Sequence, residues 1–398
     1  MDREASSVQS LPPLGLYVHF PWCVRKCPYC DFNSHTLHGE LPQERYLAAL
    51  LADLAVEAEF VRGRTITSVF FGGGTPSLFS PHALASFLEA ARALVAIAPA
   101  AEVTLEANPG TIERGRFHDY RAAGVNRVSL GAQSFSDARL RDLGRIHCAA
   151  ETIRATEELH AAGLSNFNLD LMYGLPEQNV GDAIADVDAA LRLQPSHLSH
   201  YQLTLEPGTV FAGRPPAGLA SADSCAEMQL AARERLAASG LHQYEVSAYA
   251  RPEARCRHNL NYWTFGDYVG VGAGAHGKCS RAEGNSLLVE RTQKTREPRR
   301  YLSLAGSDQG VGASSRQPVQ QRDLPFEYLM NALRLNEGFE EAQFEERTGL
   351  NLDATAAFDA LERLRGRGLI ECQGAQWRAS DRGLDLLNEV LTALLPDA

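Results

Sequence analysis

The chain of 398 residues is longer than one typical domain, and its 44% apolar content is enough for a sizeable core, so we expect one large domain and a small one. A formal net charge of −11 argues against a protein that binds nucleic acid broadly, because such proteins present a basic face. No run of 18 apolar residues and no secretory signal occur, and the eight cysteines are too unevenly spread for a disulfide-stapled secreted domain. These features predict a cytoplasmic protein without a transmembrane segment.

Segments with the pattern of buried strands alternate with segments of helical spacing from residue 15 to residue 205. Strands that alternate with helices indicate βαβ units and a parallel sheet. Six such units favour an α/β fold of the open (β/α)6 type, a partial TIM barrel, although the number alone also fits a doubly wound sheet. The predicted strands are 15–20, 66–71, 102–106, 126–130, 167–172 and 197–205, and the predicted helices are 41–60, 81–98, 112–123, 134–163 and 180–193.

After a further helix at 221–239 the pattern becomes irregular, with predicted strands at 244–249 and 267–271. Residues 306–321 are rich in Gly, Ser and Gln and are interpreted as a linker or exposed loop. Predicted helices at 326–335, 340–348, 354–365 and 381–395, with two short strands at 370–372 and 376–379, indicate a small helical, winged-helix-like domain. The predicted division is a tail at 1–13, a core at 14–305, a linker at 306–322 and a C-terminal domain at 323–398.

Three cysteines follow the first predicted strand at the spacing C-x3-C-x2-C: Cys23, Cys27 and Cys30. Three thiolates are able to hold three irons of a [4Fe–4S] cluster and leave the fourth iron open to a ligand. A zinc site with a missing fourth ligand, or three unrelated thiols, are the alternatives; structural zinc sites use four Cys or His ligands, and His19 and His35 are near in sequence. The spacing resembles that of the radical S-adenosylmethionine (SAM) superfamily, in which SAM binds the open iron.

Polar residues at the ends of the later predicted strands add to this resemblance. The triple glycine 72–74 allows a backbone to approach a small ligand closely, although a tight strand–helix turn explains it equally well. Glu106, Gln133 and Asp170 each lie at or just after a strand end, and Arg145 offers a fork for a carboxylate. Singly, each of these residues is more simply a structural or solvated polar group; together they suggest acceptors and a cation for SAM.

Three segments, 17–30, 72–77 and 168–176, together resemble the HemN-like branch of the radical SAM superfamily, which includes the oxygen-independent coproporphyrinogen III dehydrogenases. The similarity extends from about residue 14 to the C-terminus and includes the small final domain. The resemblance implies that Cys23, Cys27 and Cys30 ligate the cluster. It also implies that the SAM site is lined by Tyr17, Tyr29, Gly73, Gly74, Thr75, Glu106, Gln133, Arg145 and Asp170.

Two features separate the chain from those dehydrogenases. Their motif continues to C-x3-C-x2-C-x-C, whereas Phe32 stands at the fourth cysteine position here. Residues 258–263, with the sequence HNLNYW, match the HNxxYW motif of the sister group, the HemW-type haem chaperones. That resemblance implies that His258 contacts haem, with Tyr262 and Trp263 as an aromatic wall. A structural turn with a buried aromatic pair is the alternative interpretation of this motif.

The resemblance therefore implies a haem chaperone that carries a [4Fe–4S] cluster with exchangeable SAM, binds haem and delivers it to respiratory haem proteins. The rival is an enzyme, an oxygen-independent coproporphyrinogen III oxidase that makes protoporphyrinogen IX by radical-SAM decarboxylation. No catalytic residue is assigned on either hypothesis. Peripheral membrane contact and a homodimer are both compatible with the sequence.

Overall fold

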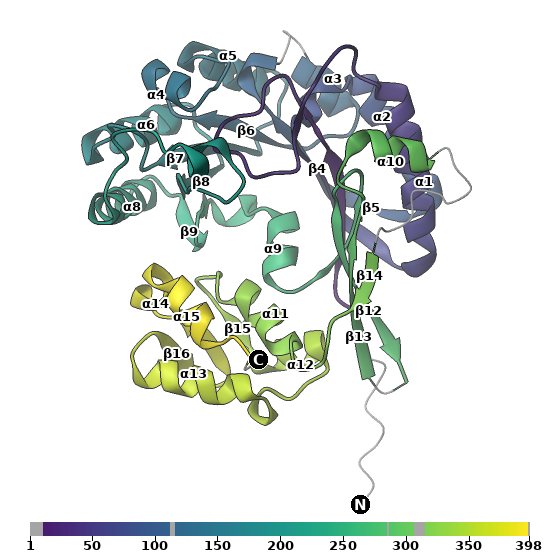
Figure 1. Ribbon diagram of the computed structural model, residues 1–398, viewed down its shortest axis with the longest axis vertical. Helices are drawn as coiled ribbons and strands as arrows, with labels where there is room; N and C mark the ends of the chain where they lie inside the picture. The colour runs from purple at the N-terminus through teal and green to yellow at the C-terminus, as the bar shows by residue number, and fades with distance from the viewer. Residues whose placement is uncertain (1–10, 112–115, 285, 306–314, 397–398) are drawn as a thin grey trace, which may run out of the picture.

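The computed structural model describes residues 11–396, except residues 112–115, 285 and 306–314. Its main feature is a curved sheet that carries helices on its outer side, with a smaller helical domain below the sheet (Figure 1). In the described part of the chain, the sheet has 12 strands in the order β14-β13-β12-β11-β1-β4-β5-β6-β7-β8-β10-β9. The open (β/α)6 barrel predicted from the sequence is confirmed, and antiparallel strands extend it at both ends.

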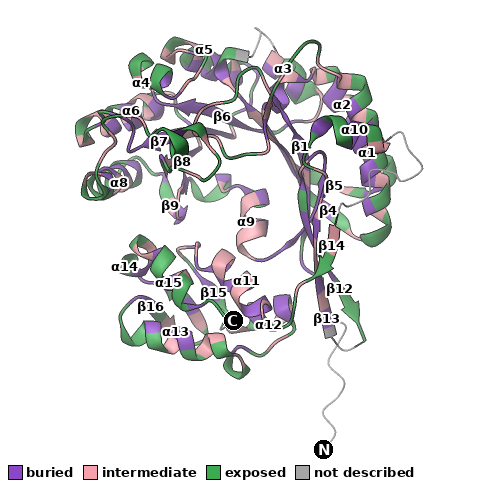
Figure 2. Cartoon of the chain, in the orientation of Figure 1, coloured by how far each residue is buried: buried purple, intermediate pink, exposed green. Residues whose placement is uncertain are grey.

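The parallel part of the sheet contains the six predicted strands. Each pairs in parallel with its neighbour, so their carboxyl ends meet at one edge. The inner strands are almost wholly buried, as Figure 2 shows; β1 is accordingly rich in apolar residues, whereas β6 alternates Val128, Leu130 and Ala132 with polar or small residues. These strands are β1 (Leu14–Phe20), β4 (Thr65–Gly73), β5 (Ala96–Ala107), β6 (Arg127–Gln133), β7 (Phe167–Tyr173) and β8 (His197–Gln202).

Helices with one apolar face connect these strands and pack on the outside of the sheet (Figure 2). Helix α2 begins where the Ser80 hydroxyl accepts a hydrogen bond from the Ala83 N–H, with Pro81 as the first helical residue. A reciprocal pair, Asn179 and Asp182, caps α6. The helices are α1 (Gln43–Phe60), α2 (Pro81–Leu94), α3 (Arg116–Ala122), α4 (Asp137–Asp142), α5 (Ala149–Ala161) and α6 (Val180–Arg192).

The predicted boundary between the second helix and the third strand is wrong. The helix expected at 81–98 ends at Leu94, and β5 begins at Ala96. The alanine-rich segment is extended because Ala96 and Ile97 pair with Thr65 and Ile66 of β4. Tertiary pairing therefore overrides the helix propensity of alanine at this point.

The strands after residue 240 complete both ends of the sheet. Strand β11 lies parallel to β1 on the side opposite β4, and the next three strands continue from it as an antiparallel meander. The expected linker at 306–321 lies partly outside the described residues, and residues 315–318 form β14 rather than a loop. These elements are β9 (His242–Glu245), β10 (Ala248–Ala250), β11 (Asp267–Val271), β12 (His276–Glu283), β13 (Ser286–Gln293), β14 (Ser315–Pro318), α7 (Val210–Gly213), α8 (Ala222–Ala237), α9 (Arg257–Trp263) and α10 (Pro298–Ala305).

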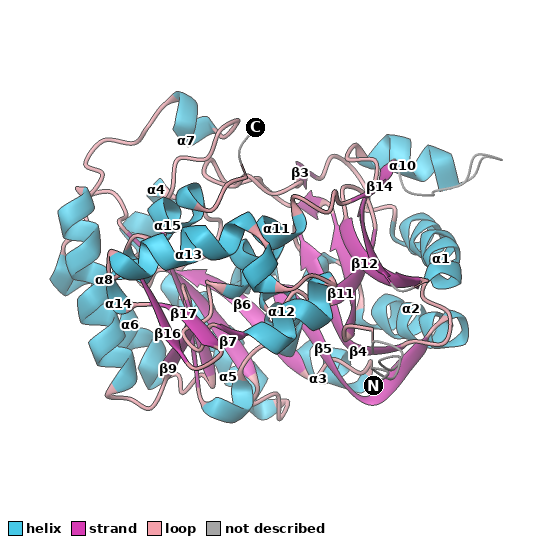
Figure 3. Cartoon of the chain, turned by 90° about the horizontal axis from the view of Figure 1, so that it is seen from below, coloured by secondary structure: helices cyan, strands magenta, loops and turns pink. Residues whose placement is uncertain are grey.

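The C-terminal domain contains helices followed by a three-stranded sheet of order β15-β17-β16. It has its own apolar core around Trp377 and Tyr328, which Phe265 and Val289 of the larger domain join. Figure 3, seen from below, shows its helices in front of the main sheet, and α9 lies between the two parts in Figure 1. The helix expected at 381–395 turns at Leu386 and is two helices. The elements are α11 (Leu324–Ala332), β15 (Phe339–Glu340), α12 (Glu341–Thr348), α13 (Ala356–Gly366), β16 (Ile370–Gln373), β17 (Gln376–Ala379), α14 (Asp381–Asp385) and α15 (Leu387–Ala393).

Among the described residues, every helix is too short or too polar to traverse a bilayer.

Candidate functional site

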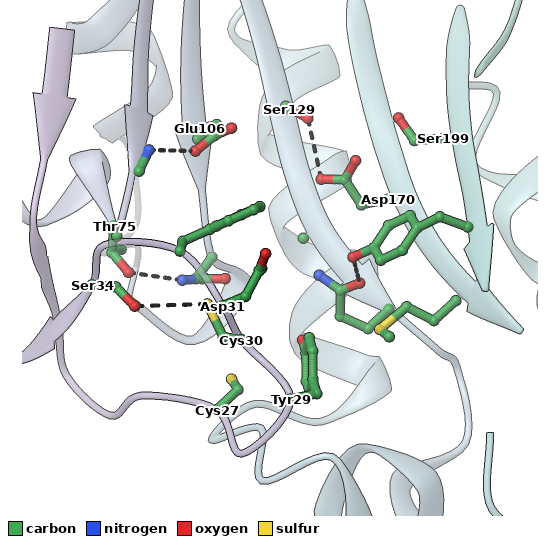
Figure 4. A pocket seen from close by; sticks show the side chains of 18 of the residues that line it. Cys27, Tyr29, Cys30, Asp31, Ser34, Thr75, Glu106, Ser129, Asp170 and Ser199 are labelled. Atoms are coloured by element: carbon green, nitrogen blue, oxygen red, sulfur yellow. Dashed lines mark hydrogen bonds between the residues drawn. The ribbon is translucent and has the colours of Figure 1, made fainter. Parts of the chain in front are cut away.

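A cavity of about 730 Å³ opens at the carboxyl ends of the parallel strands. Its size is within the range of small-molecule and cofactor sites. Figure 4 shows side chains from the cysteine loop, from the turn after β4 and from several strand ends pointing into it. Of the sequence-predicted residues, those on its wall are Cys23, Cys27, Tyr29, Cys30, Gly73, Gly74, Thr75, Glu106, Gln133, Arg145 and Asp170.

The cysteine loop is held between two very short parallel strands, β2 (Trp22–Cys23) and β3 (His35–Thr36). The Cys30 N–H donates to the Cys27 carbonyl at 3.2 Å, and the Ser34 hydroxyl lies 3.6 Å from the Cys30 sulfur. All three thiols are free and only partly buried. Burial raises the pKa of Cys23 and of Cys30, and the other cysteines of the loop raise both further. Three half-exposed thiols on one loop are therefore available to a bound metal group.

These thiols do not converge on one point. Within the described residues, no three His, Cys, Asp or Glu side chains lie close enough together to hold a single metal ion. A multi-iron cluster takes each thiolate at a different iron, so it does not need such convergence, whereas a tetrahedral zinc ion does. The donor set therefore fits a [4Fe–4S] cluster with one open iron better than it fits zinc.

The glycine turn after β4 is tied directly to the start of the cysteine loop. The Gly74 N–H donates to the Phe20 carbonyl at 2.6 Å, and the Thr75 N–H donates to the Trp22 carbonyl at 2.8 Å. Gly73 has φ +113°, and a Cβ at this position would lie 2.5 Å from the His19 ring. Both the backbone conformation and the close approach therefore require glycine here.

Two carboxylates face the cavity from neighbouring strands (Figure 4). Glu106 accepts a hydrogen bond from the Gly73 N–H at 2.9 Å, and burial, with a further contribution from Asp170, raises its pKa to about 8. Burial also raises the pKa of Asp170, although Asn168 at 2.7 Å and Ser129 at 3.2 Å donate to it. The two groups offer acceptors for hydroxyl or ammonium groups of a ligand.

A polar pair from the β6 end of the sheet completes the wall near the cysteines. Gln133 ends β6 with φ +66°, an uncommon conformation for this residue type, and accepts a hydrogen bond from Tyr201 at 2.5 Å. Arg145 donates to the Gly131 carbonyl at 2.8 Å and to Asn108, and its Nη1 lies 3.7 Å from the Cys27 sulfur. The guanidinium is thus oriented beside the cysteine loop, where it is able to bind a carboxylate.

Four predicted residues are not on the cavity wall: Tyr17 and His258, and with them Tyr262 and Trp263. The Tyr17 hydroxyl lies 2.9 Å from His19 Nδ1, and its ring packs against Phe70 and His258. His258 is 1% exposed; its Nδ1 lies 2.9 Å from Ser68 Oγ, and its ring stacks 5.0 Å from that of Phe70. Both rings lie behind Phe70, which does line the cavity. The roles predicted for them in SAM and haem binding stay predictions.

Sequence reasoning did not select several residues that the structure brings to the wall. On β6 and β7 they lie at every second residue from Gln133 or Asp170, so a period of two counted from those residues would have found them, whereas β8 carries no selected residue from which to count. One further residue, Arg334, comes from the C-terminal domain, and no local signal marks it. The alternating residues are Arg127, Ser129, Gly131, Asn168, Met172, His197, Ser199 and Tyr201.

Comparison with known proteins places this site in a family. Residues 17–190 match the model of the radical SAM superfamily, and residues 319–386 match the HemN C-terminal domain. The Escherichia coli protein named Heme chaperone HemW is 46% identical over 97% of this chain and 99% of its own length. The chain belongs to the HemW family of radical SAM proteins.

Other HemW relatives support the same assignment. The Haemophilus influenzae HemW is 42% identical over 97% of this chain and 99% of its own length. A bovine mitochondrial relative, radical S-adenosyl methionine domain-containing protein 1, is 37% identical over 96% of this chain and 87% of its own length. The Escherichia coli coproporphyrinogen III oxidase HemN superposes with a TM-score of 0.80 over 96% of this chain and 90% of its own, but at 21% identity it supports only the shared fold.

Proposed function

We propose that this chain is a haem chaperone, which binds haem in the cytoplasm and passes it to respiratory haem proteins. The observation that carries the proposal is the 46% identity to the protein named Heme chaperone HemW, over 97% of this chain and 99% of that one. Identity at this level over both full lengths includes the C-terminal domain and the segment between the two matched family models.

We further propose that Cys23, Cys27 and Cys30 hold a [4Fe–4S] cluster and that SAM occupies the adjacent cavity. A cluster with an open iron and bound SAM supplies reductive cleavage of SAM when an electron is available. In the proposed complex, the guanidinium of Arg145 binds the SAM carboxylate through its N–H groups. The carboxylate oxygens of Glu106 and Asp170 accept hydrogen bonds from the ammonium and hydroxyl groups of SAM. The three free thiols and the glycine turn tied to their loop support this assignment.

The rival function is oxidation of coproporphyrinogen III. The shared fold with HemN allows it, but Phe32 stands where the dehydrogenases carry a fourth cysteine. Phe32 lies on the cavity wall and is 58% exposed, so its ring adds no ligand for iron. This departure and the HNxxYW stretch favour the chaperone.

The test combines haem transfer with turnover on one preparation. Protein reconstituted with iron and sulfide without oxygen is titrated with haem, and the loaded protein is mixed with haem-depleted respiratory membranes. We expect a Soret band that saturates, and oxidase activity that returns as the haem moves. The same preparation with SAM, a reductant and coproporphyrinogen III should yield no protoporphyrinogen by mass. Product formation, or failure to bind haem, would overturn the proposal.

A matched pair of variants tests the cluster ligands. Cys27→Ser should lose most of the reconstituted iron, because one thiolate is removed from the set of three. Cys225→Ser, a buried cysteine away from the loop, should keep it. Full iron content in Cys27→Ser protein would contradict the assignment of the cysteine loop.

A further inference from the structure

The inner part of the cavity contains a buried cation with no partner. Arg127, at the beginning of β6, is 2% exposed and lines the cavity. Its Nε has no hydrogen-bond partner, and no carboxylate of the described residues lies within ion-pair distance of its guanidinium. An arginine side chain stays charged in proteins, and a buried charge without a partner is costly. Within the described residues, this guanidinium therefore has no directly bound anion, although Glu102 and Asp170 lie near enough to favour its charge.

The carboxylates nearest to Arg127 are already engaged. The oxygens of Glu102 accept from the N–H groups of Arg257 and His258, each at 3.1 Å, at the beginning of α9. Asp170 accepts from Asn168 and Ser129. Neither carboxylate makes an ion pair with Arg127, so an anion from outside the chain is the natural partner.

The neighbouring His197 adds no charge. Its two ring nitrogens lie 2.6 Å from Asn168 Oδ1 and 2.8 Å from the Tyr244 hydroxyl. Burial, followed by the repulsion of Arg127, holds the pKa of His197 well below its usual range, so the ring is neutral. Its hydrogen bonds are used within the protein, and Arg127 remains the group without a partner.

A second cation reaches the same cavity from the C-terminal domain. The Arg334 guanidinium lies over the Trp263 ring at 4.4 Å, and its Nη2 donates to Glu245 at 3.0 Å. Its Nε is buried without a partner, and the residue lines the cavity together with Arg127 and Asn259. Two guanidinium groups, from two domains, thus border the inner part of one cavity.

We propose that Arg127, assisted by Arg334, forms an anion subsite that takes a carboxylate of the cargo, a haem propionate. This inference rests on the proposed haem chaperone function. Guanidinium groups bind carboxylates through paired charge-assisted hydrogen bonds, and such bonds are strong where water is excluded. Haem carries two propionate carboxylates on one edge, so one buried guanidinium group is able to orient it.

The carboxylate of SAM is the other candidate for this subsite. Arg145 offers a fork for it beside the cysteine loop, where its Nη2 contacts the Gly131 carbonyl at 2.8 Å. Arg127 lies four residues before Gly131 on the same strand, about 13 Å away at the usual rise of a strand. That distance separates two backbone positions, so a carboxylate held beside the cysteine loop by Arg145 lies toward the other end of the strand from Arg127.

The test measures haem binding with and without the propionate charge. The parent and Arg127→Gln are titrated with iron protoporphyrin IX and with its dimethyl ester, and SAM binding is measured separately by calorimetry. We expect Arg127→Gln to weaken haem binding about 10- to 100-fold, which corresponds to loss of one charged hydrogen-bonded partner. Affinity for the ester should be weak in the parent and unchanged by the substitution, and SAM affinity should be unchanged.

Control variants keep the result interpretable. Arg62→Gln removes an arginine whose side chain is 76% exposed and should bind haem like the parent. Arg127→Lys keeps the positive charge but not the paired N–H donors of the guanidinium, and should recover part of the affinity for haem. If Arg127→Gln does not fold by circular dichroism, Arg334→Gln takes its place, with a smaller expected loss because Glu245 already pairs with Arg334.

The outcomes separate this inference from the proposed function. Equal haem affinity in the parent and Arg127→Gln, or equal binding of haem and its ester by the parent, would overturn the subsite alone. A loss of SAM affinity as large as the loss of haem affinity would assign Arg127 to the SAM carboxylate and overturn the propionate. Absence of haem binding by the parent would overturn the chaperone function itself.

Discussion

Two regions of this protein bury charge, and they do so differently. Beside α1, Lys294 is 0% exposed at its side chain and binds Asp53 at 2.6 Å and Glu57 at 2.7 Å. Tyr301 and Arg316 donate to the same two carboxylates. In the cavity, by contrast, Arg127 is buried and no described residue forms an ion pair with it or accepts a hydrogen bond from its Nε.

The difference distinguishes buried charges that are paired within the chain and stabilise the fold from buried charges that are left for a ligand. The network beside α1 joins that helix to the residue just after β13, to β14 and to α10, and each of its charges finds its partner within the chain, so it needs no ligand. The cavity keeps a cation and two carboxylates of raised pKa facing open space, which a folded protein tolerates where a ligand completes the site. The four predictions below test this contrast.

The largest effect is expected in the closed network. Lys294→Met leaves the buried Asp53 without a cation and Glu57 with Arg316 alone, and should lower the free energy of unfolding by about 3–5 kcal/mol in urea titrations. Arg62→Met is the matched control, because its partner Glu59 is exposed; it should change stability by less than about 0.5 kcal/mol. If Lys294→Met lowers the free energy of unfolding by less than about 1 kcal/mol, the network beside α1 does not differ from Arg127 in its contribution to stability.

The glycine turn should show the next largest effect. In Gly73→Ala the new Cβ is strained by the positive φ and lies 2.5 Å from the His19 ring. The substitution should lower the free energy of unfolding by about 2–3 kcal/mol. Gly240→Ala has a comparable φ of +78° but nothing within 4 Å, so it should cost about 1 kcal/mol and keep full iron loading. Equal losses of stability and of iron in both variants would show that the close approach at Gly73 has no role.

The Glu106 carboxyl predicts a pH dependence of stability. Its pKa is about 8 in the folded protein against an ordinary value of 4.5, so between these values the folded state keeps a proton that the unfolded state releases. The free energy of unfolding should therefore fall as pH rises from about 5 to 8, relative to Glu106→Gln, by about 3 kcal/mol. Denaturation of cluster-free parent and variant across this range measures the difference. Parallel pH profiles would contradict the raised pKa.

The smallest effect is the most informative. Arg127→Met removes a buried charge that has no partner, so the free energy of unfolding should stay within about 1 kcal/mol of the parent or rise. Lys294→Met is the natural comparison, because it removes a cation that is equally buried but paired. If the two variants lose similar stability, Arg127 belongs to the structural charges and not to a binding site.

Local patterns in the sequence were enough for most of the fold. The alternation of strands with helices and the cysteine spacing predicted the barrel and the place of the cavity, since the carboxyl ends of parallel strands share one edge. The boundary at Leu94 was missed because the pairing of Ala96 with Thr65 depends on tertiary contact. The strand at 315–318 was missed for the same reason: it forms only as an edge partner of β13.

Contacts between distant parts of the chain were harder to predict. Glu102 accepts hydrogen bonds from the first residues of α9, more than 150 residues later in the chain, and no local sequence pattern indicates such a contact. Arg127 looks like an ordinary basic residue at the beginning of a strand, and Arg334 lies in a different domain. His258 was selected by its motif alone, whereas its burial behind Phe70 depends on how α9 packs against the sheet.

The position of β1 has a consequence for the order of events during synthesis. This strand carries the cysteine loop and lies between β4, which follows it closely in the chain, and β11, at residues 267–271. Ribosomes add about 5–20 residues each second, so one edge of β1 waits many seconds for its partner. During that interval the three thiols of the loop that follows β1 lie next to an unfinished sheet edge, and on the proposed assignment a cluster that they bound early would be in place before the barrel is complete.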